Sequence, residues 1–475
     1  MPKNGSSNDF QGRKISVIGG ARSGSAAARS LGLLGANVTL WDNKSARELG
    51  AAAEEALTSG ASCVFGSSVD TALPIGTDLV VTSPGVPVTA DVLCTAIARG
   101  IPVWSEIELA YRLAVAPILA VTGTNGKTTT TLLLAAMLRD PDRRAIVCGN
   151  VSADDIKKTL VEAALEATPD DRLVAEISSF QLEWVEQFAP RVAILTNITA
   201  DHLNRHRSFE EYAETKARIF SAQQARDWAI VGYDNPISRS IGERGMAARR
   251  IWFTTGEAPP DDSPCAWIDR GVLSVRLDAA RQAIPLLPIT EMPDSLPGAH
   301  SIANVLAASS AALALGIAPE RIVAAVKQFG GVAHRMEHVA DIAGVRFVNN
   351  SMCTNVAAAI CSLEAMDRPT IVIAGGADKD MDFAPLVPAL RARAKRLILI
   401  GSAADKMETA FREGGYSAIT RAVNLETAVI AAARGAAPGE AVLLSPSCAS
   451  FDMFRDFEAR GAAFRKAVRG LEERQ

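Results

Sequence analysis

The stretch Ile118-Leu-Ala-Val-Thr-Gly-Thr-Asn-Gly-Lys-Thr-Thr-Thr-Thr131 decides the fold of this 475-residue chain. A short apolar run ends in Gly123-Thr-Asn-Gly-Lys-Thr128, and a leucine-rich pattern of helical period follows at once. Glycines let backbone N–H groups surround a phosphate, Lys127 can reach its outer oxygens, and the Thr128 hydroxyl can bind Mg²⁺. Val121 stands where the general P-loop has its first glycine. The order of strand, loop and helix nevertheless predicts a nucleoside triphosphate site, with a plain glycine-rich turn as the alternative.

Composition and charge narrow the class of protein. Hydrophobic residues make up 48% and charged residues 21%, and the length predicts two to four globular domains. A net charge of −4 gives no general argument for binding nucleic acid or a membrane surface. The seven cysteines form no C-x-x-C pair, so we expect reduced thiols rather than disulfides or a zinc site. The polar N-terminus and the lack of a long apolar run predict a cytoplasmic protein without membrane insertion.

The first third of the chain has the pattern of a nucleotide-binding βαβ unit. The run Lys14–Gly20 reads as a strand with a glycine turn, and Asn37–Asp42 reads as a second strand ending in an acidic residue. Ala21 replaces the middle glycine of G-x-G-x-x-G, which leaves a dehydrogenase fold and a structural turn as alternatives. A third strand presents Ser83 and Gly85 at its carboxyl end, where open α/β sheets bind ligands. A nucleoside diphosphate site is the favoured interpretation.

The rest of the chain predicts two further α/β blocks. Strands alternate with helical patterns after the P-loop, residues 249–288 read as a β-rich excursion, and a long helix starts near His300. The third block follows Gly331. The expected strands are 144–148, 173–177, 192–196 and 228–232 in the second block and 345–348, 370–374, 396–400 and 441–445 in the third. The fold class is therefore α/β, with a Rossmann-like first domain, a P-loop domain with a parallel sheet, and a Rossmann-like C-terminal domain.

Candidate catalytic groups follow two apolar strands of the second block. Glu176 ends one such strand, and a carboxylate there is costly to bury unless a cation such as Mg²⁺ compensates it. Asp201 and His202 follow another strand in Thr196-Asn-Ile-Thr-Ala-Asp-His202. By spacing alone, Lys216 is an ordinary solvated lysine of an amphipathic helix. The P-loop and Glu176 in the same sheet favour a functional role for His202.

The combined motifs resemble the Mur ligases, the ATP-dependent amide-forming enzymes of peptidoglycan precursor synthesis. The resemblance spans nearly the whole chain in the same order, and the sequences of residues 176–183 and 445–452 are similar to the glutamate-adding branch. It implies a UDP-substrate domain over 1–106, an ATP-binding domain over 107–331 and a glutamate-binding domain over 332–475. The motifs are the P-loop Gly123–Thr128, Glu176–Gln181, Asn197–His202, Tyr212 with Lys216, Gly298–Asn304, and His334-Arg335.

The resemblance also implies roles for individual residues. Five would be catalytic: Lys127, Glu176, His202, Lys216 and Arg335. ATP would contact Gly123, Thr124, Asn125, Gly126, Lys127, Thr128, Thr129, Asn304 and Arg335. Two Mg²⁺ ions would be held by Thr128, Glu176, His202 and Lys216, the last as a carbamylated lysine. The UDP substrate would contact Arg22, Ser23, Asn43, Lys44, Ser83, Gly85 and Asn150. Glutamate would contact Thr354, Lys379, Ser450 and Phe457.

Three positions depart from the family pattern. Asn350 and Met352 stand where an aspartate and a lysine are usual, and Ser301 replaces an asparagine expected near the adenine. Loss of one charge-assisted hydrogen bond weakens binding by roughly 1.5–3 kcal/mol unless another residue replaces it. The P-loop, metal ligands and glutamate residues are intact. We therefore expect altered nucleotide contacts rather than lost activity.

The implied reaction joins D-glutamate to UDP-N-acetylmuramoyl-L-alanine through an acyl phosphate, in a monomer whose domains close to exclude water. Several other activities remain open: an L-glutamate-adding variant, a folylpolyglutamate-synthase-like enzyme, a P-loop switch or motor ATPase, and a nucleotide-binding paralogue with reduced catalysis. The UDP-type first block disfavours the folate enzyme and the motor, and the P-loop disfavours a nicotinamide dehydrogenase.

Overall fold

Residues 9–67, 73–151, 156, 158–202, 205–259 and 263–472 are described by the computed structural model of the chain. The polar N-terminal residues 1–8, on which much of the expectation of a missing targeting signal rests, lie outside this part. The chain divides into two compact units: residues 1–286 with 304–325, and residues 287–303 with 326–475. The helices α11 (Gly298–Ala314) and α12 (Pro319–Lys327) contribute residues to both. The predicted boundary between residues 106 and 107 falls inside the first unit.

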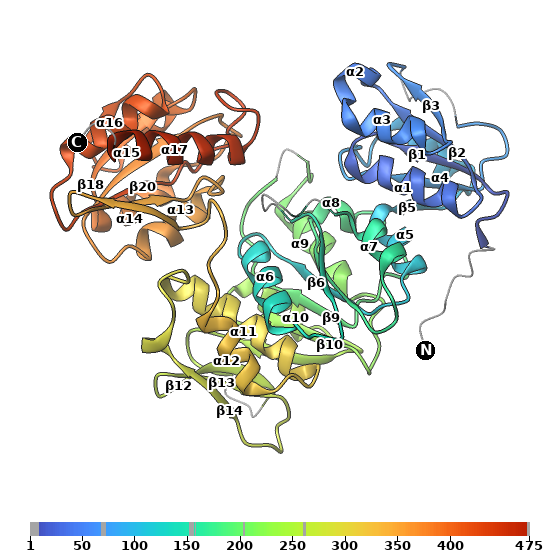
Figure 1. The fold of residues 1–475 in the computed structure, drawn as a ribbon, viewed down its shortest axis with the longest axis horizontal. Helices are drawn as coiled ribbons and strands as arrows, with labels where there is room; N and C mark the ends of the chain where they lie inside the picture. The colour runs from blue at the N-terminus through green and yellow to red at the C-terminus, as the bar shows by residue number, and fades with distance from the viewer. Residues whose placement is uncertain are drawn as a thin grey trace. The chain divides into compact units, whose positions relative to one another are not determined.

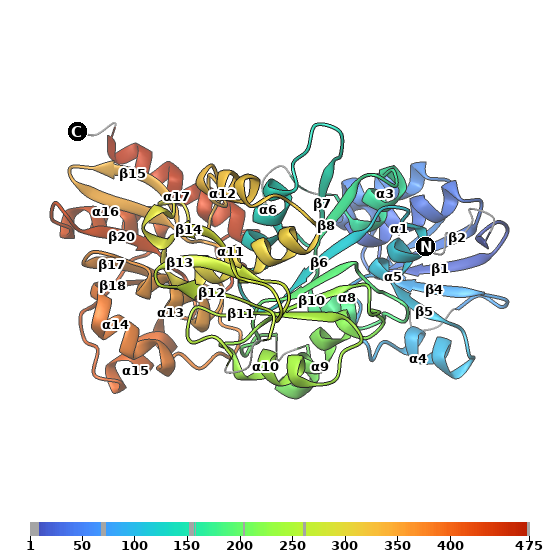
Figure 2. The ribbon, with the colours of Figure 1, turned by 90° about the horizontal axis from the view of Figure 1, so that it is seen from below.

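The first sheet of unit one is parallel throughout and has the order β3-β2-β1-β4-β5. Helices α1 and α3 pack on one face with Val17 and Val81, while α4 packs on the other with Ile18 and Val80 (Figure 2). The strands are β1 (Lys14–Ile18), β2 (Asn37–Asp42), β3 (Ser62–Phe65), β4 (Leu79–Thr82) and β5 (Val103–Ser105). The helices are α1 (Arg22–Leu33), α2 (Ala46–Leu49), α3 (Ala51–Thr58), α4 (Asp91–Ala98) and α5 (Glu106–Leu113).

The second sheet has the order β14-β13-β12-β11-β10-β9-β6-β8-β7, and the P-loop follows β6, the third strand from one edge (Figure 1). Strand β6 is buried along its whole length, as its unbroken apolar sequence requires. The strands are β6 (Ile118–Thr122), β7 (Ala145–Gly149), β8 (Arg172–Glu176), β9 (Val192–Leu195), β10 (Trp228–Gly232), β11 (Arg249–Phe253), β12 (Cys265–Asp269), β13 (Val272–Arg276) and β14 (Ile284–Pro288). The helices are α6 (Lys127–Met137), α7 (Leu160–Glu166), α8 (Ser179–Leu182), α9 (Phe209–Ala217) and α10 (Pro236–Glu243). The predicted β-rich excursion is confirmed by β11 to β14.

The third sheet, in unit two, has the order β15-β16-β20-β17-β18-β19 and is parallel except for its antiparallel edge pair β15–β16. Alternate residues of β17 face opposite layers: Val372 packs with α13 to α15, and Ile371 packs with α16 and α17 (Figure 2). The strands are β15 (Glu337–Ile342), β16 (Val345–Asn349), β17 (Thr370–Gly375), β18 (Ala394–Ile400), β19 (Ile419–Arg421) and β20 (Ala441–Leu444). The helices are α13 (Val356–Glu364), α14 (Val387–Arg393), α15 (Ala404–Glu413), α16 (Leu425–Gly435) and α17 (Phe457–Glu472). Three sheets with flanking helices confirm the predicted α/β class.

Candidate active site

The loop between β6 and α6 is folded tightly, and two of its glycines explain why. Gly123 has φ 146° and Gly126 has φ 85°, which side chains rarely adopt. A Cβ atom on Gly123 would lie 1.8 Å from Thr196 Oγ1, and one on Gly126 would lie 2.3 Å from Asn304 Oδ1. Asn304 also accepts a 3.3 Å hydrogen bond from the Thr130 hydroxyl. The structure therefore places Asn304 at the P-loop, 178 positions along the chain from Gly126.

Two lysine amines converge on the carbonyl groups of this loop. Lys127 Nζ donates to Thr124 O at 2.9 Å, and Lys216 Nζ donates to Gly123 O at 2.9 Å. Lys216 is only 2% exposed, although its helix pattern suggested a solvated lysine. Burial, together with the charge of Lys127, holds the pKa of Lys216 well below its ordinary value, while Asp201 and Glu176 oppose that shift. A buried amine with a depressed pKa carries a larger neutral, nucleophilic fraction.

Thr128 and Glu176 form the part of the site best suited to a divalent cation. The Thr128 hydroxyl donates to Glu176 Oε2 at 2.6 Å, and both residues are buried. Asn150 Nδ2 lies 3.4 Å from Glu176 Oε1. A hydroxyl beside a carboxylate, adjacent to a phosphate-binding loop, fits Mg²⁺, which takes one or two carboxylates and completes its shell with phosphate oxygens and water. No group of three His, Cys, Asp or Glu residues suited to a metal occurs within the described ranges.

Asp201 and His202 lie in the segment between β9 and α9. This segment contacts the P-loop residue Thr124. Thr199 N donates to Thr124 Oγ1 at 3.0 Å, and the same hydroxyl lies 3.0 Å from the Tyr212 hydroxyl. His202 has φ 54°, and its Nε2 is 3.7 Å from Asp201 Oδ2. The ring of His202 meets Phe180 edge-on at 5.0 Å. Charged groups predicted from separate motifs, at positions 127, 176 and 201, thus all act electrostatically on Lys216.

The predicted UDP-substrate residues lie at the carboxyl edge of the first sheet and next to it. Asp42 accepts hydrogen bonds from Gly20 N at 2.6 Å and Lys44 N at 2.7 Å, so its carboxylate shapes the turn itself. In dinucleotide-binding domains, by contrast, the acidic residue after the second strand binds the ribose of the nucleotide. Arg22 Nη2 donates to Gly149 O at 3.4 Å, which brings Arg22 beside Asn150. Ser83 is buried and donates to Gly19 O, whereas Arg22, Asn43, Lys44, Gly85 and Asn150 are exposed.

Unit two contains Arg335 and the three departures from the family pattern. Arg335 Nη2 donates to Met352 Sδ at 3.2 Å. Asn350 is 5% exposed and accepts a 3.2 Å hydrogen bond from Met336 N. The Ser301 hydroxyl donates to Pro297 O at 2.7 Å within its own helix turn. Each of the three departures is therefore engaged in a local contact.

The predicted glutamate residues lie around a loop that an unpredicted residue, Arg460, holds in place. Ser450 is buried, and Thr354, Lys379 and Phe457 are half-buried. Arg460 is fully buried and donates to Ser351 O at 2.9 Å and to Cys448 O at 3.1 Å, so it joins the segments that carry Thr354 and Ser450. Burial lowers the pKa of Arg460 to about 10. In the sequence it is one of several arginines on an amphipathic helix, and no spacing signal distinguishes it.

A second unpredicted residue, Glu106, is buried at the start of α5. Its carboxylate accepts from Val161 N at 2.9 Å and from Gln181 Nε2 at 3.4 Å. Gln181 caps α8 by accepting from Ser178 N at 2.9 Å. Burial raises the pKa of Glu106 to about 7. Glu106 thus supports the segment that follows Glu176.

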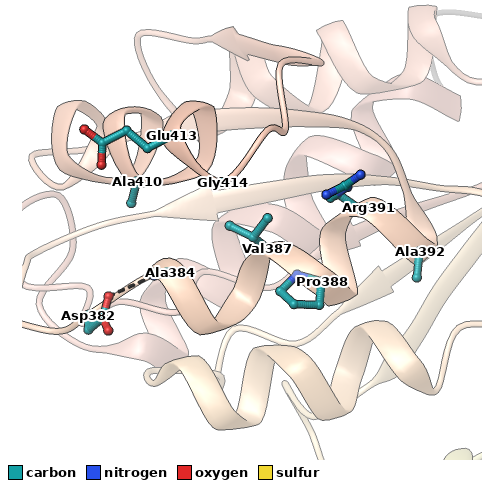
Figure 3. Close-up of a pocket in the computed structure, with 9 residues that line it drawn as sticks. All are labelled: Asp382, Ala384, Val387, Pro388, Arg391, Ala392, Ala410, Glu413 and Gly414. Atoms are coloured by element: carbon teal, nitrogen blue, oxygen red, sulfur yellow. Dashed lines mark hydrogen bonds between the residues drawn. The ribbon is translucent and has the colours of Figure 1, made fainter.

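An open pocket of about 900 Å³ lies between α14 and α15 in unit two (Figure 3). None of the residues drawn around it belongs to the predicted site. They are Asp382, Ala384, Val387, Pro388, Arg391, Ala392, Ala410, Glu413 and Gly414.

The chain is similar to known proteins along nearly its whole length. Residues 121–312 match the Mur ligase middle domain, and residues 334–448 match the Mur ligase glutamate ligase domain. The UDP-N-acetylmuramoylalanine–D-glutamate ligase of Pelotomaculum thermopropionicum is 40% identical over 472 residues, covering 98% of this chain and 99% of that protein. The protein of the same name from Thermoanaerobacter sp. is 40% identical over 465 residues, with the same coverage.

Solved structures resemble the fold at lower sequence identity. The UDP-N-acetylmuramate–alanine ligase MurC of Thermotoga maritima has a TM-score of 0.57 and 16% identity, covering 97% of this chain and 100% of that one. The MurF ligase of the same organism, solved in complex with ADP, has a TM-score of 0.59 and 16% identity, covering 92% and 96%. Fold and sequence thus define a multidomain α/β ligase with a P-loop. The chain belongs to the Mur ligase family.

Proposed function

We propose that this protein is an ATP-dependent ligase that joins D-glutamate to UDP-N-acetylmuramoyl-L-alanine in peptidoglycan precursor synthesis. The observation that supports the proposal most is the cluster at the P-loop: Lys127 and Lys216 each donate to a carbonyl group of the loop, and Thr128 donates to Glu176. Relatives that are 40% identical over nearly the whole chain and named for this reaction support it.

The chemistry requires activation of a carboxylate, which is a poor electrophile. A carboxylate oxygen of the alanyl group attacks the γ-phosphorus of ATP, the bond to the β-phosphate oxygen breaks, and ADP leaves. The amine of glutamate then attacks the carbonyl carbon of the acyl phosphate. The tetrahedral adduct loses a proton from nitrogen and expels inorganic phosphate, leaving the amide.

The residues of unit one are proposed to bind and orient the reacting phosphates. The backbone of Gly123–Gly126 and the Lys127 ammonium bind the outer phosphates. Thr128, Glu176, His202 and Lys216 would hold up to two Mg²⁺ ions, which neutralise charge on the transferring phosphoryl group. Lys216 is proposed to act as the carbamate, because a neutral buried amine reacts with CO₂ and the product is an anionic oxygen ligand.

The remaining predicted residues bind the two other substrates and the nucleotide. Arg335 is proposed to bind the γ-phosphoryl group, and Asn304 the nucleotide. Residues at the edge of the first sheet bind the UDP substrate, and residues around the Arg460-held loop bind glutamate. Within the described ranges no helix is long and apolar enough to cross a membrane. We propose that the protein acts as a monomer in the cytoplasm, where its small-molecule substrates are found.

A single assay tests the proposed function. Phosphate release is measured with ATP, MgCl₂ and UDP-N-acetylmuramoyl-L-alanine, adding D-glutamate, L-glutamate or neither. We expect sustained release with D-glutamate alone among the three conditions. Release with L-glutamate would favour the L-specific variant, and equal release without any amino acid would favour a simple ATPase.

A further inference from the structure

Arg205, in unit one, contacts two segments that are far apart in the sequence. Its Nη2 atom donates to Val86 O at 2.5 Å and to Glu183 Oε2 at 2.6 Å, and its Nε atom donates to Glu183 Oε1 at 3.1 Å. The two bonds to Glu183 make a bidentate ion pair, which is stronger and more directional than a single contact. The Arg205 and Glu183 side chains are only 13% and 7% exposed, so salt screens the pair little. One guanidinium group therefore connects residue 86 to residue 183.

The bond to Val86 reaches the predicted UDP-substrate edge of the first sheet. Val86 N donates to Ser83 O at 3.1 Å, which closes a turn over residues 83–86 (the substrate turn). The Ser83 hydroxyl donates to Gly19 O at 2.7 Å, in the glycine turn after β1. The Val86 side chain packs against the apolar cluster of the first sheet. The carbonyl group that Arg205 binds thus belongs to the turn that presents Ser83 and Gly85.

The other contacts of Arg205 reach His202. Arg205 N donates to His202 O at 2.9 Å. The guanidinium group lies 5.1 Å from the centre of the Phe180 ring, and the same ring meets the His202 ring edge-on at 5.0 Å. A cation is attracted to the face of an aromatic ring. Arg205 therefore contacts the backbone of His202 directly and the ring of His202 by way of Phe180.

Burial makes each charge of the Arg205–Glu183 pair dependent on the other. Burial raises the pKa of the Glu183 carboxyl, and the charges of Arg205 and Arg218 oppose that rise. Removal of one partner of a buried pair leaves the other charge poorly compensated, whereas removal of both charges does not. Stability and positioning can therefore be separated by experiment, because they respond differently when both residues are replaced.

We propose that Arg205 and Glu183 act as a pair of positioning residues that fixes the substrate turn relative to His202. The proposal rests on the proposed function, in which this turn binds the UDP substrate and His202 belongs to the phosphoryl-transfer site. The alanyl carboxylate is part of the UDP substrate, so its approach to the γ-phosphate depends on how the two places are held. Reacting atoms must lie about 3–3.5 Å apart, and a small misplacement lowers the rate.

The test is a double-mutant cycle with Arg205→Met, Glu183→Gln and the combined variant. Arg205→Met should lower kcat about tenfold or more and raise the KM for the UDP substrate about fivefold or more, while the KM for glutamate stays within about twofold of wild type. The dissociation constant of the UDP substrate, measured by calorimetry without ATP or Mg²⁺, should rise about fivefold or more as well. Glu183→Gln keeps the bond to Val86 and should change these values less. Wild-type kcat and KM values in Arg205→Met would overturn the proposal.

Thermal unfolding of the same variants separates positioning from folding. In the combined variant Tm should lie closer to wild type than the two single losses together predict, since neither charge is left unpaired. Its kcat should stay as low as in Arg205→Met, because the bond to Val86 is still missing. Recovery of kcat together with Tm would mean that the pair only stabilises the fold, and would overturn the proposal.

A matched control replaces another arginine of unit one that pairs with a buried glutamate. Arg112 Nε donates to Glu108 Oε1 at 2.8 Å, and its guanidinium group lies 4.0 Å from the centre of the Trp104 ring. Arg112→Met should lower Tm while kcat and the KM values stay within about twofold of wild type. Kinetic losses equal to those of Arg205→Met would show that any weakened ion pair has this effect, and would overturn the proposal.

A conservative variant keeps the proposal testable if Arg205→Met does not fold. Arg205→Lys keeps the charge but replaces the planar fork of donors by a single ammonium group. We expect Tm within a few degrees of wild type and a kcat that is severalfold lower, and a wild-type kcat would overturn the proposal. Absence of ligation by the wild-type protein would instead count against the proposed function, so the two failures are distinguishable.

Discussion

Lys216 Nζ donates a 2.9 Å hydrogen bond to the carbonyl oxygen of Gly123, the first glycine of the P-loop. This contact spans 93 residues and buries an amine that the local sequence would leave in solvent. It places the lysine near Glu176 and Asp201, whose negative charges raise the pKa of Lys216 and so oppose the larger lowering caused by burial.

Replacement of Lys216 tests whether its amine becomes a carbamate. Lys216→Ala should lower kcat roughly 100-fold or more, because an oxygen ligand and its charge are lost from the phosphoryl-transfer site. Formate or acetate in the buffer should restore part of that activity. Lys216→Arg should be as inactive as Lys216→Ala, since the required group is negative. High activity of the arginine variant, or an unmodified lysine mass in the active enzyme, would rule the carbamate out.

The Thr128–Glu176 contact predicts a shared effect on magnesium. Thr128→Val and Glu176→Gln should each raise the Mg²⁺ concentration needed for half-maximal activity, because fewer ligands remain to hold the ion. Thr130→Val is a matched control on the same helix, because the Thr130 hydroxyl contacts Asn304 and not Glu176. Unchanged Mg²⁺ dependence in both site variants would make the pair structural.

Lys379 should affect one substrate selectively. Lys379→Ala is expected to raise the KM for glutamate about tenfold or more while leaving the KM for the UDP substrate nearly unchanged, because in the proposed function its ammonium would pair with a substrate carboxylate. Lys395→Ala, which removes an exposed lysine paired with Glu440, serves as the control. Equal changes in both KM values would indicate a general defect in unit two.

Glu106 predicts a pH dependence of stability. Its pKa is raised from about 4.5 to about 7, so between these values the folded state binds a proton that the unfolded state has released. The free energy of unfolding should therefore fall as pH rises from about 4.5 to 7, by about 3 kcal/mol from this group. Urea unfolding of Glu106→Gln should show a flatter profile across that window, and the exposed Glu243→Gln should retain the wild-type profile. A Glu106→Gln profile parallel to wild type would assign the shift to other groups.

Local patterns predicted the elements that are buried on both faces. The runs that became β6, β8, β9 and β17 are continuous apolar segments bounded by glycine or polar residues, which is how buried parallel strands read. Strand β15 was not predicted, because Glu337–Ile342 mixes charged and apolar residues on an antiparallel sheet edge. Helices α13 and α16 begin after Asn355 and Asn424, whose side chains accept hydrogen bonds from Ala358 N and Thr427 N.

Site residues could be predicted from the sequence only where a local motif fixes their positions. Lys127 and Thr128 follow from the P-loop spacing, and Glu176 from the cost of a buried carboxylate. The role of Lys216 was predicted only from the family resemblance, because its burial depends on α9 packing against a loop 93 residues away. Arg460 and Glu106 were missed because a buried charge held by backbone groups leaves no periodic signal in the sequence.

In the proposed reaction, ATP bound at the P-loop activates the alanyl carboxylate for attack by D-glutamate, and an isotope measurement follows the carboxylate oxygens through that reaction. UDP-N-acetylmuramoyl-L-alanine with both oxygens of the alanyl carboxylate labelled with ¹⁸O is incubated with ATP, MgCl₂ and D-glutamate. The masses of the released phosphate and of the ligated product are then measured by mass spectrometry. We expect one ¹⁸O in each phosphate released and one in each new amide, and neither product with Lys127→Ala. Phosphate free of ¹⁸O, or release without a glutamyl product, would contradict it.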